Sequence, residues 1–183
     1  MTILENSSLK TASEAGIEID PLKGFGGMDA TITWPMQTVI EDTDIGFEVE
    51  GGFIDASVPG LAGGFGLIDS DVDVEVDNDG LILRGQGRFG PAPTEFSWVE
   101  TFSKVEGEDG HSRLEATAVV SPDFLNAFNL AARNILAGEI EVQLSAQGQG
   151  RDFEAIDARL DLTRAAIDLS EVGWIKRVNE PAS

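Results

Sequence analysis

The chain has 183 residues, of which 33 are acidic and 12 are basic, and its formal net charge is -21. This surplus of negative charge repels nucleic-acid phosphates and anionic bilayer surfaces, so we expect neither as a partner. Cysteine is absent, which excludes disulfides and thiolate sites, and no stretch approaches the roughly 18 apolar residues of a membrane-spanning helix.

The N-terminal residues 1–20 are polar and lack a sustained period, so we expect a flexible or partly ordered leader there. They also lack the basic segment and apolar run of a signal peptide. From residue 21 onward, alternation of apolar and polar side chains predicts a single β-rich domain over 21–183. About ten strands are predicted, centred on 30–34, 45–49, 54–58, 72–76, 81–87, 96–102, 114–120, 140–146, 156–162 and 167–169.

The clearest pair of strands is VDVEVDNDGLILRGQG, residues 72–87. Three valines alternate with acidic residues, a turn composition follows at 78–80, and Leu81 and Leu83 resume the alternation. This pattern is typical of a β-hairpin with one apolar face and one charged face. The apolar face then needs something to cover it.

One segment changes period from two to that of a helix. In SPDFLNAFNLAARNILAG, Ser121 has N-cap chemistry, Pro122 suits the first helical position and Gly138 follows the last turn. Apolar residues recur at helical spacing from Phe124 to Leu136. We therefore expect a single α-helix at about 121–137.

These elements predict a mainly β fold, a large curled antiparallel sheet that is half-barrel or groove-like. One face of this sheet is expected to be polar and solvated, and the other apolar. A sheet of this size has to curl, split or close. One helix of about four turns covers only part of the apolar face. The remainder either closes on itself as a barrel or stays open as a groove.

Catalytic signals are weak. His111 is the only histidine and lies in a predicted turn, where a solvated loop residue is the simpler interpretation. No serine lies in a G-x-S-x-G elbow, and the glycine-rich stretches match no phosphate-binding pattern. We therefore expect a protein that is not an enzyme and uses no cofactor.

A calcium site is a weak possibility in DSDVDVEVDNDG. Asp69, Asp71 and Asp73 stand where an EF-hand loop has its first three ligands, but Val74 replaces the required glycine and Gly80 the bidentate glutamate. Because alternation also places the acidic side chains along one outer strand face, a solvated face is the favoured interpretation and no metal is expected.

Aromatic residues gather on one strand. Phe96, Trp98 and Phe102 share one face, on which Glu100 is an exception. Core packing is the simplest interpretation, but a hydrophobic ligand site would use the same face.

Several blocks of the sequence resemble a domain of the AsmA-like family of proteobacterial envelope proteins, the relatives of YhdP and TamB. The blocks are LRGQGRFGPAPTEFSWVETF, LEATAVVSPDFLNAFNL, LAGEIEVQLSAQG and LDLTRAAIDLSEVGWIKRVNEPAS, with PLKGFGGMDATITWPMQTVIEDTDIGFEVEGG similar to the part just upstream. The likeness is a dispersed pattern that covers most of residues 20–183, and its closing block is the most specific.

The resemblance implies a periplasmic piece of a longer, inner-membrane-anchored protein. In that family, β-rich repeats form a half-open sheet thought to let phospholipids move between the inner and outer membranes. On this basis we expect a non-enzymatic module that binds or guides acyl chains in outer-membrane biogenesis. Its partners would be a phospholipid or another acyl-chain ligand and neighbouring repeats of the full-length protein, with an edge-strand dimer as a further possibility.

The lipid-facing candidates are the inward positions of the strands, together with helix residues that cap or plug one end. They are Val72, Val74, Val76, Leu81, Leu83, Phe96, Trp98, Phe102, Phe124, Leu125, Phe128, Ile140, Val142 and Leu144. Two alternatives stay open. One is a structural or protein-interaction β-domain with a packed core and no ligand, and the other is an enzyme acting on acidic-tolerant or calcium-linked envelope polymers.

Overall fold

The computed structural model describes residues 23–37, 44–62, 64–102, 111–129, 135–150 and 152–180, so the predicted leader lies outside the described residues. The large sheet contains β1 (Lys23–Thr33), β2 (Gly46–Ala62), β3 (Phe65–Asp77), β4 (Gly80–Phe89), β5 (Ala92–Thr101), β6 (His111–Val120), β8 (Ile140–Gln149) and β9 (Asp152–Asp161). The other elements are α2 (Pro122–Asn126), β7 (Leu136–Gly138), β10 (Ala165–Leu169), the 3-10 helix η2 (Ser170–Val172) and β11 (Trp174–Lys176).

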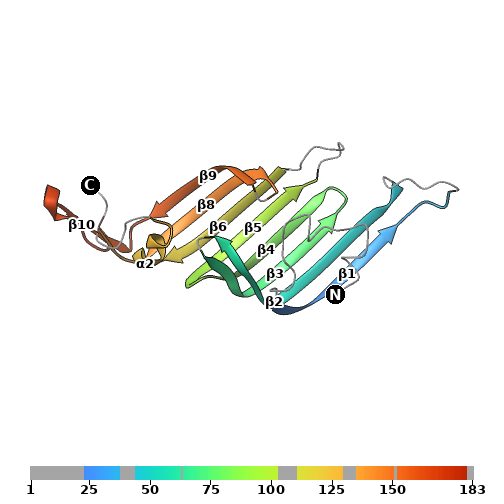
Figure 1. The fold of residues 1–183 in the computed structure, drawn as a ribbon, viewed down its shortest axis with the longest axis horizontal. Coiled ribbons are helices and arrows are strands. Elements are labelled where there is room, and N and C mark those ends of the chain that lie inside the picture. Colours follow the sequence, from blue (N-terminus) through green and yellow to red (C-terminus); the bar gives the residue numbers. More distant parts are fainter. Residues whose placement is uncertain are drawn as a thin grey trace.

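The large sheet is antiparallel throughout and runs in the order β1-β2-β3-β4-β5-β6-β8-β9 (Figure 1). Neighbours in space are neighbours in sequence, except between β6 and β8, where the chain forms α2 and β7. The two edge strands β1 and β9 do not pair with each other, so the sheet is not closed into a barrel. The predicted mainly β fold and its antiparallel meander are confirmed, and the sheet is the open one of the two forms expected.

The β3–β4 hairpin shows how the sequence divides the sheet into two faces. Val74 pairs with Leu83, as the alternation predicts. Because successive side chains of a strand point to opposite faces, these residues lie on an apolar face and the acidic residues between them on a polar face. The turn is held by Asp77, whose Oδ1 accepts hydrogen bonds from the backbone N–H groups of Asp79 and Gly80 at 2.8 and 2.9 Å.

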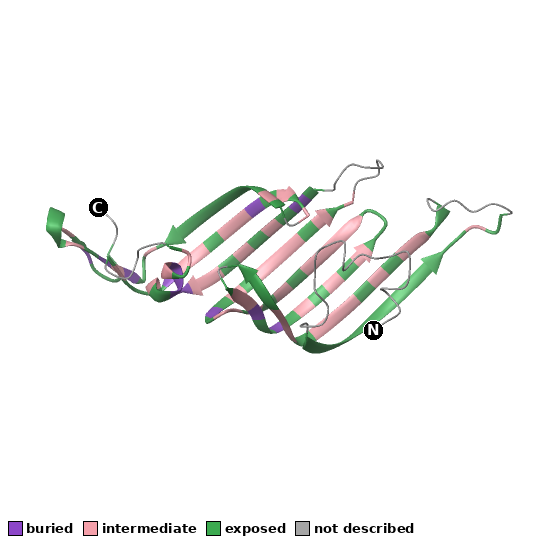
Figure 2. Cartoon of the chain, in the orientation of Figure 1, coloured by how far each residue is buried: buried purple, intermediate pink, exposed green. Residues whose placement is uncertain are grey.

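The compact core lies at one end of the apolar face, where α2 meets the ends of β6 and β8 (Figure 2). The ring of Phe124 stacks on Phe65 at a centroid distance of 5.1 Å and meets Phe89 edge-on at 6.0 Å. The full cluster, which we call the packed end, comprises Ala92, Val120, Phe124, Leu125, Ile140 and Ala165, with Phe65, Phe89, Ala118, Phe128, Leu136, Val142 and Leu162 packed against them.

The predicted helix is correct at its start and wrong in its length. The hydroxyl of Ser121 accepts a hydrogen bond from the N–H of Phe124 at 3.3 Å, so the N-cap is as expected. The helix nevertheless ends at Asn126, and Asn129 adopts a left-handed φ of 60°. Near the predicted C-terminus, Leu136 pairs with Ile167 as part of β7. Pairing with a distant strand has overridden the local helical period there.

Between residues 45 and 66 one expectation changes, and a glycine-rich stretch proves to be strand. The predicted strands at 45–49 and 54–58 are parts of one 17-residue strand, β2, whose pairing is irregular around Asp55, a residue with φ 53°. The glycine-rich stretch at 60–66 is also mostly strand, because β2 continues to Ala62 and β3 begins at Phe65. This extension carries the ring of Phe65 into the packed end.

A second, three-stranded antiparallel sheet with the order β11-β10-β7 adjoins the packed end. Its main connection to the rest of the chain is made by Lys176, whose side chain is buried at 4% exposure. The ammonium group of Lys176 donates hydrogen bonds to the carbonyl oxygens of Leu162 and Ala165, each at 2.8 Å, and of Arg177 at 3.2 Å. Three carbonyl acceptors compensate for burying this charge.

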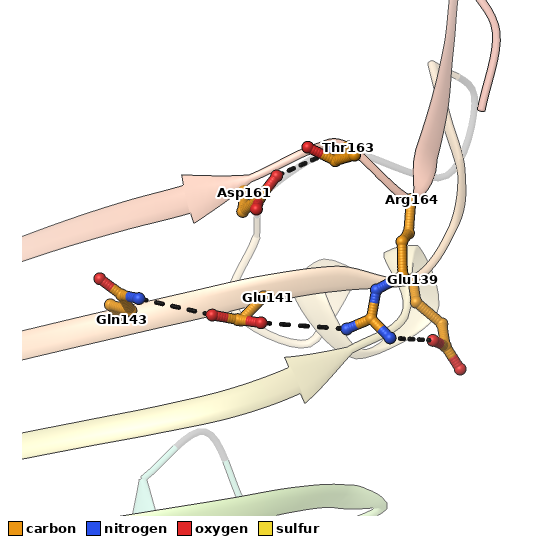
Figure 3. Close-up of polar contacts among 6 residues, drawn as sticks. All are labelled: Glu139, Glu141, Gln143, Asp161, Thr163 and Arg164. Carbon is orange, nitrogen blue, oxygen red and sulfur yellow. Dashed lines mark hydrogen bonds and ion pairs between the residues drawn. The ribbon is translucent and has the colours of Figure 1, made fainter. Parts of the chain in front are cut away.

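Exposed polar contacts surround the same junction (Figure 3). The guanidinium of Arg164 lies 3.3 Å from a carboxylate oxygen of Glu139 and 3.9 Å from one of Glu141. The carboxylate of Asp161 accepts a hydrogen bond from the N–H of Thr163 at 2.7 Å, and the hydrogen bonds from Thr163 lower the pKa of Asp161. Exposed ion pairs of this kind contribute at most about 1 kcal/mol each, so Lys176 is the stronger connection.

Candidate ligand-binding face

The strand register arranges the apolar side chains in rows that cross the sheet. One row comprises Gly26, Phe53, Val72, Gly85, Phe96, Ala116, Leu144 and Ala158. The second comprises Met28, Gly51, Val74, Leu83, Trp98, Leu114, Ala146 and Ile156. The third comprises Ala30, Val49, Val76, Leu81, Glu100, Ser112, Gly148 and Phe153. We call these three rows the open face, because the strands that carry them make their main contacts within the sheet rather than with a second layer.

The predicted lipid-facing residues separate into two groups. Those that lie half-buried in the open face are Val72, Val74, Val76, Leu81, Leu83, Phe96, Trp98 and Leu144. Those that belong to the packed end are Phe124, Leu125, Phe128, Ile140 and Val142. Ile140 has 0% exposure, and Phe124 and Leu125 of α2 pack over one end of the apolar face. Phe102 follows β5 and its N–H donates to the carbonyl of Asp79 at 2.9 Å.

Glycine and phenylalanine are matched within the first row. Gly85 lies opposite Phe96, and a Cβ atom added to Gly85 would sit 2.8 Å from the Phe96 ring. The missing side chain therefore gives the ring room to lie against the backbone of β4. The glycine thus avoids a steric clash between β4 and the Phe96 ring on the open face.

Two aromatic rings bridge the open face near one margin. The rings of Trp98 on β5 and Phe153 on β9 are 6.3 Å apart, although β6 and β8 lie between their strands. Ser112 and Ala146, which belong to those intervening strands, are only 3% and 2% exposed. The indole Nε1 of Trp98 is itself buried and has no hydrogen-bond partner among the described residues. An orphan donor of this kind is uncommon in a folded protein.

A single acidic residue interrupts the open face. Glu100 pairs with Leu81 on β4 and Ser112 on β6. Burial raises the pKa of the Glu100 carboxyl, and the Ser112 hydroxyl partly offsets that rise, although its Oγ has no hydrogen bond of normal geometry. No ion pair joins Glu100 to a basic group among the described residues.

The polar face has a depression. It has a volume of about 1000 Å³, crosses the sheet from β3 to β9 and is lined by five carboxylates, two guanidinium groups and neutral polar residues, together with residues of the first row of the open face. The charged residues are Asp71, Asp73, Glu95, Glu115, Asp157, Arg84 and Arg159. Acyl chains would not bind among these charges, because an ion transferred from water to an apolar surrounding loses its hydration.

The calcium hypothesis receives no support from the described part of the chain. Asp71 and Asp73 alternate along the polar face of β3, and Asp69 lies at an irregularity in the β3–β4 pairing. No group of three or more histidine, aspartate or glutamate side chains there converges on a point that could hold an ion. The only histidine of the sequence, His111, is exposed at the start of β6.

Several residues of the open face were missed by sequence reasoning. Leu114 and Val49 were assigned to strands but not to the ligand face, and their alternation was a sufficient signal. Phe153 carried no such signal, because a shift of register between Gln147 and Gly148 brings it onto the apolar face. Glu100 is an exception to the apolar pattern in the sequence, but only the structure shows that no basic group of the described residues pairs with it.

Comparison of the chain with protein-family models, with curated proteins and with solved structures finds no match. Among the described residues there is no helix with the length and apolar character needed to cross a bilayer.

Proposed function

We propose that this chain is a non-enzymatic module that binds or guides phospholipid acyl chains along its open face. The observation that carries the proposal is the run of three apolar rows across eight strands, over which the described residues place no second layer. Contiguous exposed apolar surface of this extent is a feature of interaction and ligand sites rather than of an ordinary solvated surface. The resemblance to AsmA-like envelope proteins suggests the setting, which is lipid movement through the periplasm between the inner and outer membranes.

The physical chemistry of acyl chains suits such a face. Each methylene group gains about 0.8 kcal/mol when it is fully buried, and it requires no particular polar partner. On an open sheet, only one side of the acyl chain leaves the water, so the gain per methylene is smaller and affinity accumulates with length. Continuous apolar rows would also let a chain slide, which is what guiding requires.

The first experiment is native mass spectrometry of the purified chain, followed by solvent extraction and identification of any lipid. Phospholipid bound at near one molecule per chain supports the proposal. Detection of only the lipid-free protein mass, even after incubation with dispersed short-chain phospholipid, contradicts it. Lipid is added back to delipidated protein, and the same chain unfolded in urea serves as the control. Binding to the folded chain alone distinguishes specific binding from non-specific adsorption of lipid.

A structural or protein-interaction domain is the second candidate, and one observation favours it. The edge strand β1 is exposed along its whole length and presents Phe25, Met28 and Ile32, whose side chains are 72%, 49% and 56% exposed. Among the described residues no strand pairs with its outer edge, and such an edge with apolar side chains is suited to pairing with another strand. Sedimentation of the full chain at several concentrations tests this candidate, because a strand-paired dimer would dissociate on dilution.

A further inference from the structure

Within the part of the chain that the structure describes, the open face carries one charged group and no basic group to balance it. Among the described residues that register places on the apolar face from β3 to β9, Glu100 is the one that ionises. It lies one residue from the end of β5, at the margin of the face, so a long ligand could lie along the rows and end beside it. A lone carboxylate within an apolar surface calls for a cation.

The surroundings of Glu100 suit a cation better than an anion. Trp98 lies two residues away on the same face, and aromatic rings attract ammonium groups through their π-electrons. Among the described residues, the nearest ionisable neighbours by register are Asp79, in the turn before β4, and His111 and Arg113, which pair with Thr101 and Val99 and therefore face the polar side. The net charge of -21 also opposes an anionic ligand.

We propose that Glu100, with the ring of Trp98, holds the ammonium headgroup of a lipid whose acyl chains lie along the open face. This proposal rests on the proposed function and adds a chemical preference to it, namely for ammonium-bearing over anionic headgroups. Glu100 is a positioning group for the headgroup, and the apolar rows supply affinity for the chains. Its single carboxylate sets the orientation of the lipid on the sheet.

The test compares two lipids that have the same acyl chains and differ in their headgroups, of which one bears an ammonium group and the other is anionic. Dihexanoyl phosphatidylethanolamine and dihexanoyl phosphatidylglycerol have the same acyl chains and stay dispersed, and their Kd values for the full chain are measured by titration calorimetry. We expect the ethanolamine lipid to bind about fivefold more tightly to the wild type, the scale of one half-buried charge pair. The variant Glu100→Gln should remove most of this preference, and Glu100→Lys should weaken it further or reverse it.

The matched control is Glu95→Gln, which removes a carboxylate from the same strand but from the polar face, and it should leave the preference unchanged. Circular dichroism and urea unfolding confirm that each variant is folded. As the pH falls and Glu100 takes up a proton, the wild-type preference should diminish, whereas that of Glu100→Gln should not change.

Two results would overturn the inference while leaving the proposed function intact. One is equal affinity of the wild type for both lipids, and the other is an equal loss of affinity for both lipids in Glu100→Gln. Binding of neither lipid would overturn the proposed function and this inference together.

Discussion

The packed end and the open face are made of the same kinds of residue on the same side of one sheet, but they differ in what lies above them. At the packed end, α2 and the second sheet cover the strands, and Ile140 is 0% exposed. On the open face, the valines and leucines of β3 and β4 remain half-buried. The comparison teaches that one apolar surface can form a packed core at one end and remain uncovered by the described residues elsewhere.

The strongest way to test this division is to damage the packed end. Phe124→Ala removes a ring that contacts Phe65 and Phe89, so the free energy of unfolding should fall by about 3–5 kcal/mol, as in other cores. Urea unfolding measures the change. The control Phe25→Ala removes a ring that is 72% exposed and should change stability by less than about 0.5 kcal/mol. Similar losses from both variants would show that the packed end is not the main core.

The next largest effect on stability is expected at Lys176, which connects the second sheet to the rest of the chain. Lys176→Met keeps the apolar stem but leaves the carbonyl groups of Leu162 and Ala165 without their donor, so we expect a loss of about 1–3 kcal/mol. Hydrogen exchange of the β10 and β11 amides should rise most. Arg177→Met is the control, since its guanidinium is exposed and lies 3.8 Å from Glu180. If Lys176→Met leaves exchange in β10 and β11 unchanged, the second sheet is held by apolar packing alone.

A charge in the open face should separate folding from binding. Leu83→Asp places a carboxylate in the middle row, where solvent still reaches it, so we expect a stability loss of only about 1–2 kcal/mol together with loss of lipid binding. Thermal unfolding and native mass spectrometry measure the two effects. The control Gln86→Asp changes the polar face of the same strand and should preserve binding. Outright unfolding of Leu83→Asp would mean that the middle row is core.

The smallest expected effect concerns Glu100 in the absence of ligand. Because burial raises its pKa in the folded chain above the ordinary value of 4.5, the folded state holds the proton more tightly than the unfolded state. Its ionisation therefore opposes folding at neutral pH, and this penalty disappears as the pH falls through the raised pKa. Glu100→Gln should stabilise the chain at pH 7 by at most about 1 kcal/mol, since solvent still screens the half-buried group.

This difference between Glu100→Gln and wild type should shrink as the pH falls toward 4.5, and melting curves across that range measure it. Asp161 and Asp168 act in the opposite sense, because hydrogen bonds from Thr163 and Ser170 lower their pKa values. Their stabilisation is lost as the pH falls, in both proteins alike, and so cancels from the comparison. A difference that stayed constant with pH would show that Glu100 is not desolvated.

Much of the fold could be read from the strand alternation. The hairpin at 72–87 and the strands β5, β6 and β8 fall where their alternating residues predict them, because the direction of each side chain is a local property of an extended backbone. Short connections then favour an antiparallel meander. The N-cap at Ser121 was equally local and equally predictable.

What local pattern could not predict depends on distant contacts. Leu136 is in a strand because it pairs with Ile167, and Phe65 is a core residue because β2 and β3 extend through a glycine-rich stretch. A register shift in β8–β9 brings Phe153 to meet Trp98 across two strands. The alternation of the chain thus specified that an apolar face exists, whereas the tertiary structure decided which end is packed and which part is open. The physical reason is that a strand's two faces follow from its own backbone, but the cover over a face comes from segments far away in the sequence.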